Sequence, residues 1–278
     1  MAQNYAATYA PMAEEAFALG SLTSVFSAKY NWTGVKTVNV FTNTAIAAAA
    51  YVASAGYGTP GLIANTVDDL VVAKDRKFVG LLDRLLADST EGAASSAAWL
   101  GMETRQVVTP DIDAYRFGAL FTACPTGQIS ATGAITSANA YTKFLTGQTM
   151  LDENAVPTVG RVAFCVPSFI NLLKQDSNYV KASDLGQQII INGQVGEIDG
   201  VPVVKVPSAS HMNKATDNHV EFMIVHKDAV AAPMKLEDVE IFETVPLYSG
   251  SLIQGRYVHD CFLLDAMNAA IYIPKHAG

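Results

Sequence analysis

The residues in this chain that are best suited to acid–base or metal chemistry are its five histidines. His211 and His219 lie in one polar loop and could bind a metal ion together only if that loop folded back. His259 precedes Asp260 in an apolar run that predicts a strand, where neighbouring side chains point to opposite faces. A His–Asp relay is therefore not expected, and neither is a metal site.

Nucleophilic and acid–base catalysis are not supported by the other candidate residues. Cys165 lies in the apolar run AFCVP, where burial would raise its pKa and leave the thiol inert. The adjacent carboxylates Asp68-Asp69 and Glu237-Asp238 belong to expected strands, so their side chains diverge. Phosphate-binding loops, the G-x-S-x-G elbow and paired zinc-spaced cysteines do not occur in the sequence. We expect a protein that is not an enzyme and that has no cofactor.

The composition favours a protein that buries apolar surface between subunits. Half of the 278 residues are hydrophobic and 16% are charged, compared with about 25% in typical soluble domains. The most apolar run, Thr44–Ala55, is too short to cross a bilayer, and Met1–Gly20 lacks the features of a secretory signal. Cys124, Cys165 and Cys261 are odd in number and widely spaced, which predicts buried reduced thiols. We expect a protein made in the cytoplasm, without membrane contact.

The elements that would position any interaction site include a projecting hairpin. Residues 36–44 and 66–82 read as two long strands, joined by a segment rich in glycine, alanine and proline. An isolated two-stranded hairpin cannot bury itself, so it needs an external partner. Residues 1–29 predict an extended or partly helical arm that gains order by lying on a neighbouring subunit.

The predicted interface residues belong to this hairpin and to a later acidic strand. A dense charge cluster on the hairpin's return strand either forms a solvated face or pairs with the next subunit, with Glu240 on the complementary side. Aromatic residues of the hairpin region are candidate anchors, although Trp32 could equally pack in the core. The candidate interface residues are Trp32, Tyr57, Lys74, Asp75, Arg76 and Glu240.

The rest of the chain mixes helices and strands without βαβ regularity, which predicts an α+β fold. A helix over residues 91–123 should bend or break near Val108 because of Pro110. A second helix should follow Ser137, and the last third should be mostly strands. Asp199-Gly200 predicts a tight hairpin turn with positive φ angles.

Several segments carry a resemblance to a known family. GRVAFCVPSFINLLKQDSNYVKASDLG precedes the hairpin segment NGQVGEIDGVPVVKVPS, and IVHKDAVAAPMKLEDVEIFE follows it. YNWTGVKTVNV, GYGTPGLIANTVDDLVVAKDRKF and RQVVTPDIDAYRFG occur earlier in the chain. In this order the segments resemble the major capsid proteins of tailed bacteriophages with the HK97 fold. The resemblance implies an N-terminal arm (1–35), an extended loop (36–90), a peripheral P-domain with a spine helix (91–133 and 228–262) and an A-domain (134–227 and 263–278).

The resemblance also implies a function and partners. The chain would self-assemble into hexamers and pentamers of an icosahedral head, formed in the host bacterial cytoplasm, that encloses double-stranded DNA contacted non-specifically. Because the chain begins almost at the arm, we expect either a separate scaffolding protein or assembly without one. A portal and possibly a decoration protein are further expected partners. Two alternatives stay open: a cellular shell protein of the encapsulin type that encloses an enzyme, and a soluble hydrolase with an unrecognised site.

Overall fold

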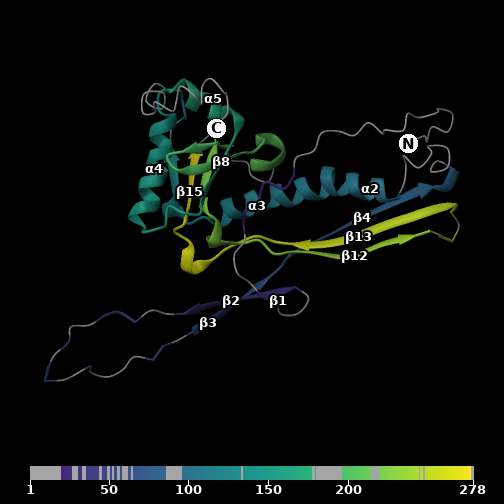
Figure 1. Ribbon diagram of the computed structural model, residues 1–278, viewed down its shortest axis with the longest axis horizontal. Helices are drawn as coiled ribbons and strands as arrows, with labels where there is room; N and C mark the ends of the chain where they lie inside the picture. The colour runs from purple at the N-terminus through teal and green to yellow at the C-terminus, as the bar shows by residue number, and fades with distance from the viewer. Residues whose placement is uncertain are drawn as a thin grey trace.

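The computed structural model describes residues 20–26, 31–32, 36–43, 46–48, 51, 53–54, 57, 62–63, 65–85, 96–132, 134–176, 179, 196–213, 219–243, 245–246 and 248–276. Helices and strands are mixed along the chain, as an α+β fold requires. A body of sheet and helices occupies one end of the molecule, a long helix and a three-stranded sheet extend from it, and a narrow hairpin projects separately (Figure 1).

The body is built around a seven-stranded sheet, which we call the main sheet, in the order β5-β15-β10-β6-β8-β7 with β9 beside β15. Most pairs are antiparallel, but β6 with β8 and β15 with β5 are parallel. Its strands are β5 (Ile129–Thr132), β6 (Arg161–Cys165), β7 (Glu197–Ile198), β8 (Val201–Lys205), β9 (His219–Val220), β10 (Phe222–His226) and β15 (Ile271–His276).

Strand β6 shows why the main sheet is stable, because all five of its residues are buried. Val162 and Phe164 pack into a core with the long helix, whereas Ala163 and Cys165 pack into a second core on the opposite face. Two helices cover that opposite face: α4 (Ala140–Glu153) and α5 (Pro167–Gln175). Because successive side chains of β6 point to opposite faces of the sheet, the strand contributes to two separate cores.

The long helix is continuous from Ser96 to Ala123 (Figure 1), and its backbone hydrogen bonding is irregular at one place. It consists of α2 (Ser96–Glu103), a π-helical turn η1 (Thr104–Val108) and α3 (Thr109–Ala123). Pro110 has no backbone NH to donate, and the Thr104 carbonyl accepts hydrogen bonds from the backbone NH of Thr109 and, at 2.9 Å, from the Thr109 hydroxyl. The irregularity expected near Val108 is thus a π-helical turn that does not separate the helix into two.

A three-stranded sheet, the spine sheet, lies along this helix in the order β12-β13-β4. Its strands are β4 (Lys74–Asp83), β12 (Met234–Phe242) and β13 (Gly250–His259). Phe78 and Tyr257 pack on Val108 and Ile112 of the helix, with Trp99 at the edge of the cluster. Strand β13 pairs with β4 over the whole length of both strands.

The hairpin consists of β2 (Thr37–Asn43) and β3 (Asn65–Val71), with β1 (Asn31–Trp32) beside β2. It extends away from the body and from the spine sheet (Figure 1). The single return strand expected over residues 66–82 is wrong, because the run divides at Val72 and Ala73 into β3 and β4. Val72 is buried against Val38 and Val258, so the chain leaves one sheet and enters the other at that point.

Residues 20–26 correct the expectation that the arm orders itself only on a neighbour. Phe26 is buried and lies 5.4 Å, ring to ring, from Phe164 of the main sheet. Asp113 of α3 accepts hydrogen bonds from the backbone NH of Leu22 at 2.7 Å and from the hydroxyls of Ser21 and Thr23. The earlier part of the arm lies outside the described residues.

Short elements complete the fold. The Asp199-Gly200 turn joins β7 to β8 with φ angles of 50° and 75°, as the sequence predicts. All three cysteines are buried and free. Burial raises the pKa of Cys124 and of Cys261 to about 12 and also raises that of Cys165. The remaining elements are η2 (Thr126–Gln128), η3 (Ser208–Met212), η4 (Lys227–Ala229), β11 (Val230–Ala231), β14 (Phe262–Leu263) and η5 (Asp265–Met267).

Candidate subunit-interaction surface

The hairpin root, where β3 passes into β4, carries an ion-pair cluster on its exposed side. Arg256 donates two hydrogen bonds to the Asp75 carboxylate, at 2.8 Å from Nε and 2.6 Å from Nη2. Lys36, just before β2, donates to the same carboxylate at 2.7 Å. The hydrogen bonds from Arg256 and Lys36, aided by their positive charges, hold the pKa of Asp75 well below its usual range. Asp75 thus joins β4, β13 and the start of the hairpin.

A buried carboxylate lies on the other side of the same root. Asp260 follows β13, is 4% exposed, and accepts a hydrogen bond on Oδ2 from the backbone NH of Ala73 at 2.7 Å. Its Oδ1 accepts from the Tyr115 hydroxyl and from the backbone NH of Cys261, both at 2.8 Å. Burial, and secondly the hydrogen bond to Asp260, raise the pKa of Tyr115, so its hydroxyl remains a donor.

The predicted charge cluster is divided between the two faces of β4. Lys74 and Arg76 face the long helix: the Lys74 ammonium lies 5.0 Å from the Tyr115 ring centre, and Arg76 lies 3.8 Å from Asp111. Asp75 faces the opposite side with Arg256. All three residues therefore have partners within the chain, and a role between subunits stays a prediction.

The side of the spine sheet that is turned away from the helix combines charged and apolar residues. We call it the outer sheet face. Cross-strand pairing places Glu240, Gln254 and Val79 in one row and Phe242, Leu252 and Leu81 in the next. Val79, Leu81 and Phe242 are 59%, 46% and 42% exposed. The members of the outer sheet face are Asp75, Lys77, Val79, Leu81, Glu240, Phe242, Leu252, Gln254 and Arg256.

The hairpin also exposes apolar residues. On β3, Val67, Asp69 and Val71 are exposed and lie on one face of the strand. Leu70 lies on the other face and packs against the apolar cluster around Val72 at the root. Tyr57, a predicted anchor, is 98% exposed, and its ring contacts Tyr51 at 5.5 Å. Trp32 lies in β1 opposite Val38. The exposed apolar residues of the hairpin are Ile46, Tyr51, Tyr57, Leu62, Ile63, Val67 and Val71.

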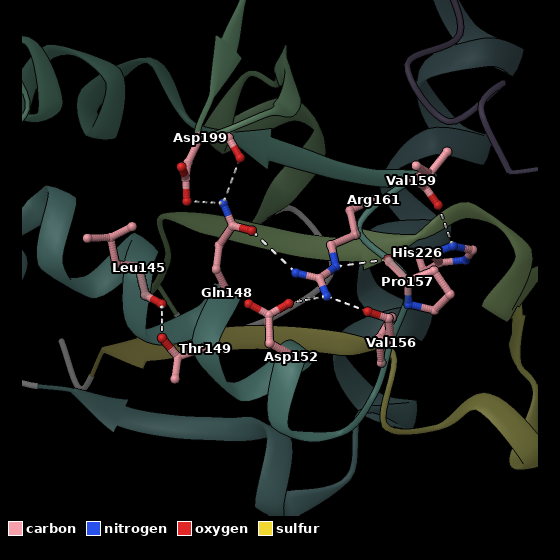
Figure 2. Close-up of polar contacts among 10 residues, drawn as sticks. All are labelled: Leu145, Gln148, Thr149, Asp152, Val156, Pro157, Val159, Arg161, Asp199 and His226. Carbon is pink, nitrogen blue, oxygen red and sulfur yellow. Dashed lines mark hydrogen bonds and ion pairs between the residues drawn. The ribbon is translucent and has the colours of Figure 1, made fainter. Parts of the chain in front are cut away.

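The body, by contrast, is held by a buried polar network around Arg161 (Figure 2). Its guanidinium is fully buried and donates to Asp152 at 2.6 Å, to Gln148 at 3.3 Å and to the Pro157 carbonyl at 3.1 Å. Gln148 in turn donates to Asp199 in the β7-β8 turn. The network joins α4, β6 and that turn, so it fixes these three parts of the body to one another.

The histidines do not assemble into a site within the described residues. His211 is buried in η3 with its Nδ1 2.7 Å from the Ser210 hydroxyl, whereas His219 lies exposed in β9. His259 is 1% exposed and packs between the rings of Tyr115 and Tyr257. No group of three potential metal ligands occurs in the part of the chain that the structure describes. Over the same residues, no helix is both long and apolar enough to cross a membrane.

Sequence reasoning missed the residues that hold the root together. Lys36 is 39 residues from Asp75 in the chain, whereas Arg256 is 181 residues from Asp75 and Asp260 is 187 residues from Ala73. The pairing of β13 with β4 brings Arg256 and Asp260 to the root. One signal was present: Asp260 is a lone carboxylate at the end of an apolar strand, where a buried charge requires several hydrogen-bond donors.

Comparison with known proteins places the fold. No family model matches the sequence, and no curated protein matches it either. Solved structures match over nearly the whole chain. The capsid structure of cyanophage P-SCSP1u matches with a TM-score of 0.75 at 15% identity, covering 98% of this chain and 93% of the other.

Two further structures give the same result. A structure from Mycobacterium phage Che8 has a TM-score of 0.73 at 17% identity, with 96% and 95% of the two chains covered. The mature capsid of bacteriophage PhiM1 has a TM-score of 0.69 at 9% identity, with 98% and 92% covered. The resemblance to capsid proteins is thereby confirmed at the level of the fold: this chain has the fold of bacteriophage capsid proteins.

Proposed function

We propose that the chain is the major capsid subunit of a tailed phage, with the HK97 arrangement of arm, extended loop, P-domain and A-domain. Hexamers and pentamers of the subunit form an icosahedral head around double-stranded DNA, and a separate scaffolding protein guides their assembly. The observation that carries the proposal is the whole-chain likeness to phage capsid structures. An exposed apolar hairpin supports it, because such a surface needs a partner.

The partner that fits the hairpin is the outer sheet face of an adjacent subunit. Val67 and Val71 on β3 offer apolar surface, and Val79, Leu81 and Phe242 offer the same on the outer sheet face. The hairpin adds the exposed Asp69, and the outer sheet face adds Lys77. Apolar contacts would supply the affinity, and the charge pair would fix the register. Tyr57 and Trp32 would be additional anchors, and Glu240 would lie at the rim.

The size of the purified particle tests the function. Expressed alone, or with the scaffolding protein encoded beside its gene, the 29.5 kDa chain should form capsomers or shells, measured by analytical ultracentrifugation and negative-stain microscopy. Shells that contain an enzyme and no DNA would favour a cellular compartment. A protein that stays monomeric or dimeric under both conditions would contradict the proposal.

A charge exchange tests the contact. Asp69→Lys and Lys77→Asp should each reduce assembly, and the double variant should restore it. One exposed pair contributes only about 0.5 kcal/mol, but a closed shell repeats the contact in every subunit. Lys77 is a better position for this test than Lys74 or Arg76. Reversing the charge of Arg76 would also break its ion pair with Asp111 within the subunit, and Lys74 contacts the Tyr115 ring. Single variants that assemble like the natural protein would exclude this pairing.

A further inference from the structure

Among the described residues, the hairpin passes into the spine sheet at one narrow junction. Only Val72 and Ala73 separate β3 from β4, so the hairpin and the spine sheet are different sheets joined by a two-residue link. The direction in which the hairpin leaves the body therefore depends on the contacts made by that link. Val72 supplies an apolar contact with Val38 and Val258, and its NH donates to the Lys36 carbonyl at 2.8 Å.

Apolar contacts hold the link against the body but define its angle weakly, because they are not directional. Hydrogen bonds are directional. The bond from Val72 NH to the Lys36 carbonyl connects the link to the start of the hairpin, whereas the bond from Ala73 NH to Asp260 orients the link toward the end of β13.

We propose that Asp260 is the positioning residue that sets the direction of the hairpin. Its two oxygens bind three donors from separate parts of the chain: the Ala73 link, Tyr115 of the long helix, and the Cys261 backbone. The backbone NH of Asp260 itself donates to the Pro233 carbonyl at 3.1 Å, which holds the end of β13 against the residue before β12. Asp260 thus relates the hairpin link directly to the helix.

Asp75 is the obvious competitor, since it also spans the root. Its ion pairs with Lys36 and Arg256 are exposed, so solvent screens them, whereas Asp260 is buried. In addition, Lys36 reaches Asp75 through a long flexible side chain, whereas Asp260 binds the backbone of the link itself. We therefore expect Asp260 to define the angle more strongly than Asp75.

Spin-label distances measured on the unassembled full-length subunit test the proposal. Labels at Thr66→Cys on β3 and Thr142→Cys on α4 report the angle between hairpin and body; both positions are exposed. The three natural cysteines are buried and have raised pKa values, so they should not react. Asp260→Asn should broaden the distance distribution at least twofold or shift its centre. The matched control Asp75→Asn and the variant Tyr115→Phe, which leaves the Ala73 bond intact, should change it less.

Two results would overturn the proposal: a distribution in Asp260→Asn equal to that of the natural protein, or an equally large change in Asp75→Asn. If Asp260→Asn does not fold, amide exchange of the natural subunit decides instead. The Ala73 amide should exchange at least about tenfold more slowly than in an open chain, and an unprotected amide would contradict the proposal.

A role for this angle in assembly rests on the proposed function, but the distance measurement does not. If the natural protein forms no shells while Asp260→Asn still broadens the distribution, the positioning role stands and the capsid role fails. If Asp260→Asn broadens the distribution and shells form normally, the capsid role stands, and the angle is not needed for assembly.

Discussion

The main sheet and the hairpin are both β-structure, but they are stabilised in opposite ways. Every residue of β6 is buried, and helices cover both faces of the sheet around it. The hairpin exposes Val67, Val71 and Tyr57, and its packing within the subunit is concentrated at its root. The body therefore carries the stability of the subunit, whereas the hairpin's apolar surface is available for another chain. The stability of the chain and its proposed assembly should respond to different substitutions.

The largest effect on stability should come from the body. Phe222 is fully buried among Phe169, Phe144 and Tyr272, with ring centres 4.5, 5.6 and 6.1 Å away. Phe222→Ala should lower the free energy of unfolding by about 3–5 kcal/mol, measured by urea denaturation. The control Tyr57→Ala should change it by less than about 0.5 kcal/mol. Equal losses of unfolding free energy in the two variants would show that the body and the hairpin contribute equally to stability.

A somewhat smaller loss should follow from breaking the buried polar network. Arg161→Met keeps a long side chain but removes the donors to Asp152, Gln148 and the Pro157 carbonyl. The free energy of unfolding should fall by about 3 kcal/mol, because buried acceptors lose their partners. Asp152→Asn should cost less, since Asp152 is partly exposed. If Arg161→Met left the free energy of unfolding unchanged, apolar packing alone would hold the body together.

Acid should weaken the junction between body and spine sheet through His259. Neither ring nitrogen has a hydrogen-bond partner among the described residues, and burial lowers the pKa to about 4 from an ordinary 6.5. Asp111 and Asp260 oppose this decrease, whereas Arg116 and Arg76 add to it. Below pH 6.5 the unfolded chain binds a proton that the folded chain does not bind.

The contribution of His259 to the free energy of unfolding should therefore be fully present above pH 6.5 and should be lost as the pH falls toward 4. This loss should be at most about 3 kcal/mol. The difference in unfolding free energy between the natural protein and His259→Phe, measured across that range, isolates the contribution. A difference that does not change with pH would mean that His259 is not buried in its neutral form.

The smallest effect should come from a turn at the margin of the main sheet. Gly200 has a φ of 75°, and a Cβ built there meets no atom within 4 Å. Gly200→Val should therefore cost about 1–2 kcal/mol through backbone strain alone. Gly200→Asn is the matched control, because asparagine tolerates this conformation better. An unchanged melting temperature in Gly200→Val would show that the turn can relax.

Local patterns in the sequence predicted the local features well. Pro110 marked the irregularity of the long helix, Asp199-Gly200 marked a turn with positive φ, and the apolar run around Cys165 marked a buried strand. These features depend on a few neighbouring residues. The run from residue 66 to 82 was misread as one strand, because its division at Val72 depends on Val38 and Val258, which are distant in the chain.

The candidate site was predicted only in part, and for the same reason. The charged residues of β4 were identified, but a sequence does not show which face of the strand each one occupies until the pairing with β13 is known. Arg161 lies inside an apolar run, and nothing local indicates that Asp152 and Gln148 accept its hydrogen bonds. Roles that depend on distant partners required the structure.

The attachment of residues 20–26 has a mechanical consequence. Asp113 binds Ser21, Leu22 and Thr23, and Phe26 is inserted beside Phe164. Tension applied at Gly20 would reach α3 through Asp113 before it reached β6 through Phe26. The long helix would then bear the load along several hydrogen bonds at once. A pulling experiment from the N-terminal side should therefore detach this segment first, with the body still folded.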